Sequence, residues 1–343
     1  MQNWQPPAHW QQITTIDAHT AGEPLRIITS GFPELPGSTI LEKRQYARQH
    51  YDHLRKTLMW EPRGHADMYG CILTPPVTPD GDVGVLFMHN EGFSTMCGHG
   101  IIGLVKVGVE TGFFPAQGTQ TIVKIDTPAG RVTATAHRRD DGHVERVSFR
   151  NVPSFLLERD LRVQVEGLGT VTCDIAFGGA FYAYVDADSV GMKIAPENQR
   201  ALIDVGMRIK RAVMASYQIV HPDGNPDLNF LYGTILVKRF TQGAVHSRNV
   251  CIFAEGEVDR SPTGTGVSGR LAIHYARGEL GLNEPITIES LISTPFTGRV
   301  VETAQVSGLP AIIPEVSGTA FITGKHTFLI DPDDPLKAGF LLR

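Results

Sequence analysis

The sequence of 343 residues lacks the features that mark several special classes of protein. No apolar run approaches the roughly 20 residues that a bilayer requires, so we expect no membrane span. The first residues carry neither a basic segment nor an apolar stretch, so we expect no secretory signal. With a formal net charge of −5, the chain also lacks the basic excess typical of nucleic-acid-binding proteins.

Cysteine is scarce, with four residues at widely spaced positions. Their spacing forms neither a zinc-binding pair nor a disulfide framework. We therefore expect reduced thiols and a cytoplasmic protein. A lone cysteine commonly serves as a small buried apolar residue, and we interpret Cys71, Cys173 and Cys251 in this way.

The length is sufficient for two domains of roughly 150 residues each. Strand-like and helix-like segments recur in the same order in both halves, so we predict domains at 1–160 and 161–343. The sequence leaves open whether the last strands return to the first domain. Apolar spacing predicts helices over 39–59 and 196–217, and Thr39 with Glu42 fits a capping box.

A glycine pattern occurs twice, 166 residues apart (263 − 97). The first copy is Cys97-Gly98-His99-Gly100-Ile101-Ile102-Gly103, and the second is Thr263-Gly264-Thr265-Gly266-Val267-Ser268-Gly269. A fixed offset suggests two copies of one structural unit. Each copy is expected to begin a helix, so that two helix N-termini face one ligand. The first copy begins with a thiol, whereas the second has a hydroxyl at the same position.

Both copies match the G-x-G-x-x-G pattern, which alone is a weak sign of nicotinamide-cofactor binding. Neither follows directly from a predicted strand, so we rank that interpretation last. Glycines also let a ligand approach backbone N–H groups, and a helix N-terminus favours an anion such as a small carboxylate. The competing interpretation is that the glycines only permit close helix packing.

Cys97 is the candidate general base. A cysteine at a helix N-terminus has a lowered pKa, so we expect a thiolate that removes a C–H proton. Thr263 has a hydroxyl that does not ionise near neutral pH and is not a second thiol base. His99 either assists the substrate or leaving group or bonds to backbone at the helix start.

Two polar residues near the second helix start are candidate substrate-binding groups. Asp259 either caps its own loop or accepts hydrogen bonds from a substrate ammonium. Thr265 occupies the position that matches His99 and can donate to a carboxylate. No Cys/His pair with metal-ligand spacing lies near Cys97, and we expect no metal.

Five segments closely resemble the proline racemase family: 17–24, 61–70, 96–100, 177–182 and 259–266. The resemblance spans most of the chain. It implies an α/β (α+β) fold of the diaminopimelate-epimerase type, in which two pseudo-symmetric domains each curl a sheet around a central helix. The substrate site of such a fold lies in the cleft between the domains.

Racemases and epimerases of this family carry one cysteine on each side of the substrate Cα. This sequence departs from them because Thr263 stands at the second position, a combination that resembles trans-3-hydroxy-L-proline dehydratases. The resemblance implies that Cys97 is the proton acceptor, that no cofactor is needed, and that the protein forms a homodimer. It places the substrate at Gly98, His99, Asp259, Gly264 and Thr265.

The residue chemistry agrees with dehydration. Removal of the Cα proton leaves negative charge beside a carboxylate, and two helix N-termini can stabilise it. A hydroxyl on the next carbon then leaves as water, so one thiolate suffices and the product is pyrroline-2-carboxylate. The alternatives are a proline racemase or hydroxyproline 2-epimerase that uses Thr263 or a water, and a non-catalytic binder of proline-like amino acids.

Overall fold

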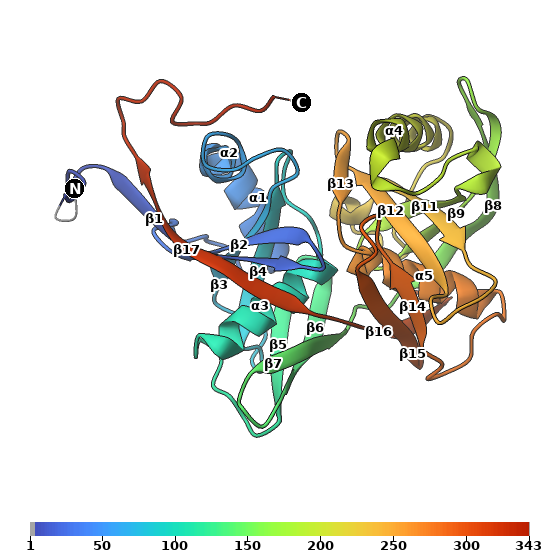
Figure 1. Ribbon diagram of the computed structural model, residues 1–343, viewed down its shortest axis with the longest axis horizontal. Coiled ribbons are helices and arrows are strands. Elements are labelled where there is room, and N and C mark those ends of the chain that lie inside the picture. Colours follow the sequence, from blue (N-terminus) through green and yellow to red (C-terminus); the bar gives the residue numbers. More distant parts are fainter. Residues whose placement is uncertain (1–3, 343) are drawn as a thin grey trace.

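The computed structural model describes residues 4–342 and consists of two halves that lie side by side (Figure 1). The strands of the first half are β1 (Gln11–Thr20), β2 (Glu23–Ser30), β3 (Tyr69–Thr74), β4 (Val83–His89), β5 (Gln120–Thr127), β6 (Gly130–Arg138) and β7 (Val144–Arg150). Those of the second half are β8 (Phe155–Val165), β9 (Gly169–Phe177), β10 (Phe181–Asp186), β11 (Leu231–Arg239), β12 (Ser247–Phe253), β13 (Glu257–Asp259), β14 (Ile286–Glu289), β15 (Pro295–Val306) and β16 (Leu309–Gly318). The last strand, β17 (Ala320–Ile330), returns to the first half and pairs with β1.

The strand pairing repeats between the halves. In the first half, β2 is parallel to β3 and β4 is parallel to β5, while β3 and β4 are antiparallel. In the second half, β10 is parallel to β11 and β12 is parallel to β14, while β11 and β12 are antiparallel. The halves join where β7 pairs with β16. This matching order confirms the predicted fold of two similar curled sheets.

A buried helix occupies the centre of each half. Helix α3 (Gly98–Glu110) connects the parallel strands β4 and β5, and helix α5 (Gly264–Ala276) connects β13 to β14. Every residue from Gly98 to Val109 in α3 is buried, as is every residue from Gly264 to His274 in α5. A helix surrounded on all sides needs mostly small or apolar residues, which the glycines and aliphatic residues provide, and the buried Lys106 and Arg270 have polar partners.

The other helices cover the sheets from outside. They are α1 (Ile40–His50), α2 (Asp52–Met59) and α4 (Gln199–Ser216), with 3₁₀ turns at Asp188–Val190, Pro196–Asn198 and Pro226–Leu228. The capping box is confirmed: the Glu42 N–H donates to Thr39 Oγ1 at 3.1 Å, and the Thr39 N–H donates to the Glu42 carboxylate. The single helix predicted over 39–59 is wrong, because Tyr51 leaves the helical conformation (φ −126°) between α1 and α2.

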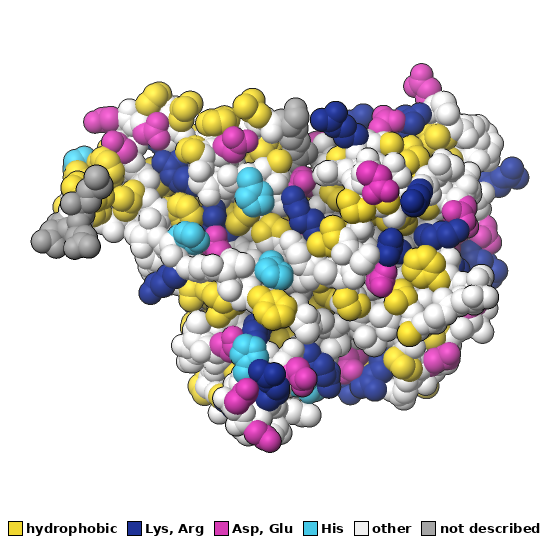
Figure 2. All heavy atoms as spheres, in the orientation of Figure 1, with side chains coloured by type: hydrophobic (Ala, Val, Ile, Leu, Met, Phe, Trp, Pro, Cys, Tyr) yellow, Lys and Arg dark blue, Asp and Glu magenta, His cyan; other side chains and the backbone are white. Residues whose placement is uncertain are grey.

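On the face shown in Figure 2, basic and acidic side chains are interspersed and apolar side chains are scattered between them. Within residues 4–342, no helix is both long and apolar enough to cross a membrane.

Candidate active site

The two central helices begin against each other. A Cβ added to Gly98 would lie 2.5 Å from the Cα of Gly264, and one added to Gly264 would lie 2.7 Å from the Cα of Gly98. Such distances are far below van der Waals contact, so only glycine fits at either position. The first turns of α3 and α5 therefore direct their free N–H groups toward one small region. The same glycines thus permit this close packing and leave backbone N–H groups open toward the shared region.

We expect Gly98→Ala to separate these helix starts. The added methyl group overpacks the contact and should lower the free energy of unfolding by about 1–3 kcal/mol. Urea unfolding followed by circular dichroism measures this loss. Gly92→Ala is the matched control, because a Cβ at Gly92 meets nothing within 4 Å and its stability should hardly change. Equal stability of the two variants would contradict the proposed close contact.

Cys97 is the N-cap residue of α3. Its extended backbone (φ −146°, ψ 112°) lets Sγ accept a hydrogen bond from the Gly100 N–H at 3.3 Å. The Nδ1 atom of His99 lies 3.2 Å from the same sulfur. The thiol is 5 % exposed and faces the region between the helix starts. The helix start predicted from the sequence is therefore present, and its N-cap residue carries the thiol.

Thr263 is the N-cap residue of α5, yet its conformation differs from that of Cys97. Its φ is +65°, which is unusual for a β-branched residue, and its side chain makes no capping hydrogen bond. The turn before it is held by Ser261, whose Oγ accepts from the Thr263 N–H at 3.1 Å. Among the described residues, the buried Thr263 hydroxyl makes no well-formed hydrogen bond, although it lies close enough to the Cys251 thiol to lower the pKa of that thiol. The second helix start therefore presents a hydroxyl where the first presents a thiol.

One small pocket brings together all seven residues predicted from the sequence. It is lined by Glu23, Tyr69, Met96, Cys97, Gly98, His99, Tyr182, Tyr232, Cys251, Phe253, Asp259, Thr263, Gly264 and Thr265. Its volume of about 20 Å³ holds about one water molecule.

The other predicted residues each have a defined partner. Asp259 Oδ1 accepts from the Ser261 N–H at 2.7 Å, so the loop-capping interpretation holds for that oxygen. The hydroxyls of Thr265 and Tyr182 lie 2.7 Å apart. His99 is buried, and its ring packs edge-to-face on Tyr69 with centroids 4.7 Å apart. Burial lowers the pKa of His99, which favours the neutral imidazole.

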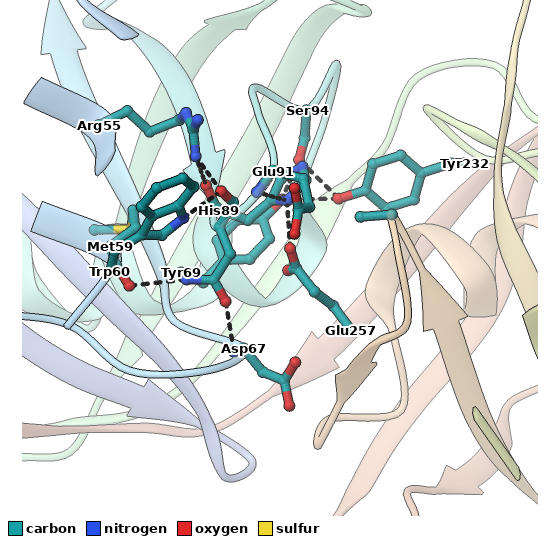
Figure 3. A network of polar contacts seen from close by, with 12 residues as sticks. Arg55, Met59, Trp60, Asp67, Tyr69, His89, Glu91, Ser94, Tyr232 and Glu257 are labelled. Atoms are coloured by element: carbon teal, nitrogen blue, oxygen red, sulfur yellow. Dashed lines mark hydrogen bonds and ion pairs between the residues drawn. The ribbon is translucent and has the colours of Figure 1, made fainter. Parts of the chain in front are cut away.

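A polar network behind the pocket connects the two halves (Figure 3). Ser94 hydrogen-bonds with Tyr69 and lies 2.9 Å from the hydroxyl of Tyr232. Beside it, His89 Nδ1 lies 3.0 Å from Glu257 Oε1, and both side chains are buried. Tyr232 and Glu257 come from the second half, whereas the other three come from the first. The network thus fixes the back wall of the pocket to both halves.

The expectation that Cys97 is a thiolate with a lowered pKa is not met, because this thiol is buried. Burial raises the pKa of the Cys97 thiol well above its usual value, and Asp259 and Glu23 raise it further. Hydrogen bonds involving Gly100 and Tyr69 lower the pKa but do not overcome burial. A helix N-terminus alone therefore does not ionise a cysteine that is shielded from water.

Sequence reasoning overlooked two groups in the pocket. Cys251, interpreted as a plain core residue, is buried but also lines the pocket beside Thr263, which lowers its pKa against the dominant effect of burial. Glu23 is fully buried at the start of β2 and also lines the pocket. No local pattern around either residue indicated this, because strand pairing brings them there.

A larger cavity than this pocket lies elsewhere in the described part of the chain. It measures about 780 Å³ and is lined by β5, β6, β7, β15 and β16, with polar side chains such as His137, Arg150 and Glu315. The described residues that line it include no cysteine and no helix start. Across residues 4–342, no three or more His, Cys, Asp and Glu side chains gather in an arrangement that could hold a metal ion. The smaller pocket is therefore the candidate active site.

A two-lobed α/β fold with a thiol at a shared pair of helix starts is the arrangement expected of a thiol-dependent enzyme with a small anion-binding site. The family model described as proline racemase matches residues 15–341, and the chain belongs to this family.

Three known proteins illustrate the similarity. A trans-3-hydroxy-L-proline dehydratase of Colwellia psychrerythraea is 51% identical, over 100% of this chain and 97% of its own length. A 3-hydroxyproline 2-epimerase of Burkholderia multivorans is 45% identical, over 97% of this chain and 99% of its own length. The crystal structure of a hydroxyproline epimerase from Agrobacterium vitis, with bound trans-4-hydroxy-L-proline, superposes with a TM-score of 0.92 at 32% identity, covering 98% of this chain and 96% of that one.

Proposed function

We propose that this protein dehydrates trans-3-hydroxy-L-proline to pyrroline-2-carboxylate, with Cys97 as the base that removes the Cα proton. The observation that carries the proposal is the pairing of one thiol with one hydroxyl. Cys97 and Thr263 are the N-cap residues of the two central helices around the same pocket, and only Cys97 carries a side chain that can act as a thiolate base. The dehydratase name of a relative at 51% identity supports it.

The stereochemistry of this substrate suits a single base. Its hydroxyl is trans to the carboxylate, and the Cα proton is also opposite the carboxylate. The proton and the hydroxyl therefore leave from the same face of the ring. No group on the opposite face has to return a proton, so the reaction does not need a second thiol at Thr263.

Substrate binding also favours the thiolate form of Cys97. The positive charge of the substrate ammonium favours the Cys97 thiolate and so opposes the burial that raises the pKa of this thiol. The substrate ammonium pairs with Asp259, the carboxylate whose negative charge disfavours the thiolate. The substrate carboxylate meets the N–H groups at the starts of α3 and α5, where charge that develops at Cα is also stabilised.

The test is NMR of the purified protein with trans-3-hydroxy-L-proline in heavy water. We expect the substrate signals to be replaced by those of pyrroline-2-carboxylate, without any added cofactor. Recovery of unchanged substrate, or binding without conversion in a calorimeter, would reject the dehydratase in favour of a binding protein.

The second candidate function is Cα epimerisation, favoured by the name of the relative at 45% identity. It would need Thr263 or a water to return a proton on the second face. The same NMR experiment separates the two functions. Deuterium at Cα with inverted configuration and an intact hydroxyl would indicate the epimerase.

A further inference from the structure

Glu23 is a buried carboxyl group that the mechanism above does not yet use. It begins β2, lines the candidate active site together with Cys97, and is 0% exposed. Its Oε2 accepts a hydrogen bond from the Arg260 N–H at 2.7 Å. Among the described residues, its Oε1 has no hydrogen-bond partner. A buried polar atom without a partner is costly, and such atoms in a pocket are typical of functional groups.

The surrounding structure holds Glu23 in place from both halves. The tight turn at Ala21 and Gly22 has positive φ angles of 52° and 96°, and it brings Glu23 back beside the start of α3. The Thr20 hydroxyl donates to the His99 carbonyl at 2.9 Å, and the Thr294 hydroxyl donates to the Ala21 carbonyl at 2.7 Å. The backbone before Glu23 is thus held from both halves, while the carboxyl group bonds to Arg260 of the second half and lines the pocket with Cys97.

We propose that Glu23 is the catalytic acid that protonates the departing hydroxyl group, an assignment that rests on the proposed dehydratase function. Dehydration needs both a base and an acid, because hydroxide is a poor leaving group. The base and the acid must act on one ring face, since the Cα proton and the hydroxyl share it. Glu23 and Cys97 come from the same half and line the same pocket.

The protonation state of Glu23 suits this role. Burial raises the pKa of Glu23 well above its usual value, and Asp259 and Asp67 raise it further, whereas Arg260 lowers it. Because Oε2 accepts from Arg260, the proton belongs on Oε1, the oxygen without a partner. His99 is the competing acid, but burial lowers its pKa and it lies 3.2 Å from the Cys97 sulfur.

The atoms balance in one cycle. The Cα–H bond breaks, its proton goes to the Cys97 thiolate, and its electron pair forms the double bond between Cα and C3. The C3–O bond breaks as the Glu23 proton moves to the oxygen, which leaves as water. The enamine acid then tautomerises to pyrroline-2-carboxylate. The Cys97 thiol returns a proton to the Glu23 carboxylate, directly or through water, and both groups are ready for the next substrate.

The variant Glu23→Gln tests the assignment because it keeps the shape and the acceptor for the Arg260 N–H but has no proton to give. We expect formation of pyrroline-2-carboxylate to fall at least about 100-fold, a typical contribution of a general acid. Exchange of the Cα proton of L-proline in heavy water should stay within about threefold of the unaltered protein. L-Proline has no leaving group, so its exchange reports the Cys97 step alone.

Two further variants make the result interpretable. Glu23→Asp keeps an acid and should restore part of the dehydration that Glu23→Gln loses. Glu315→Gln, at a carboxylate outside the pocket that pairs with Arg299, should dehydrate normally. Normal dehydration by Glu23→Gln, or loss of exchange together with dehydration, would overturn the role of Glu23 alone. Absence of any dehydration by the unaltered protein would instead overturn the proposed function, and this role with it.

Discussion

Replacement of Cys97 with serine is expected to reduce dehydration of trans-3-hydroxy-L-proline by about 10²–10⁴-fold, the range that a general base contributes. A serine hydroxyl does not ionise near neutral pH, so it cannot take the Cα proton. The fold should not suffer, because serine is a strong N-cap residue and can accept the hydrogen bond from Gly100 that Sγ accepts now. Product formation by NMR and thermal unfolding of the same sample measure the two effects.

Cys173→Ser is the matched control. Cys173 lies in β9, is buried, and is not part of the pocket. Its hydroxyl replacement is expected to lower the free energy of unfolding by about 1–3 kcal/mol, because a buried polar group without a partner is unfavourable. Its turnover should stay normal at a temperature where it is folded. Normal turnover by Cys97→Ser, or equal loss of turnover in both variants, would remove Cys97 from the proposed mechanism.

Short sequence patterns predicted the features that depend on residues close together in the chain. The duplicated glycines indicated two helix starts, and the structure places Cys97 and Thr263 at those caps. Thr39 and Glu42 gave a capping box that the structure contains. The apolar spacing over 39–59 did not reveal the break at Tyr51, because buried positions continue in phase on both sides of it.

Long-range pairing determined what the sequence could not indicate. The pairing of β17 with β1 and of β7 with β16 depends on how the two halves dock. The same docking places Glu23 against Arg260 and Cys251 beside Thr263. It also buries Cys97, and burial reversed the pKa direction expected from a helix N-terminus. Residue types thus predicted the chemistry of the site, whereas its electrostatics depended on tertiary packing. The predicted domain boundary near residue 160 stays a prediction.

Replacement of Thr263 with cysteine is expected to place a thiol at the start of α5 as well as at the start of α3 and, with it, to allow Cα inversion. Thr263 lines the pocket from the start of α5, as Cys97 does from the start of α3. A proton removed by one thiol can then be returned by the other on the opposite face of the ring. L-Proline should yield D-proline, at a rate that chiral chromatography can follow. Cysteine is not β-branched, so the backbone at φ +65° should accept it readily.

Three conditions make this prediction specific to the new thiol. The assay contains a reducing agent, because a cysteine at 263 would stand beside Cys251 and could form a disulfide with it. Thr263→Ser, which has a hydroxyl but no thiol, should give no inversion. Cys97→Ser combined with Thr263→Cys should also give none, because each ring face needs its own acid or base. A folded Thr263→Cys variant that exchanges the Cα proton of L-proline without inverting it would show that position 263 does not reach the second face, and the argument from one thiol and one hydroxyl would lose its basis.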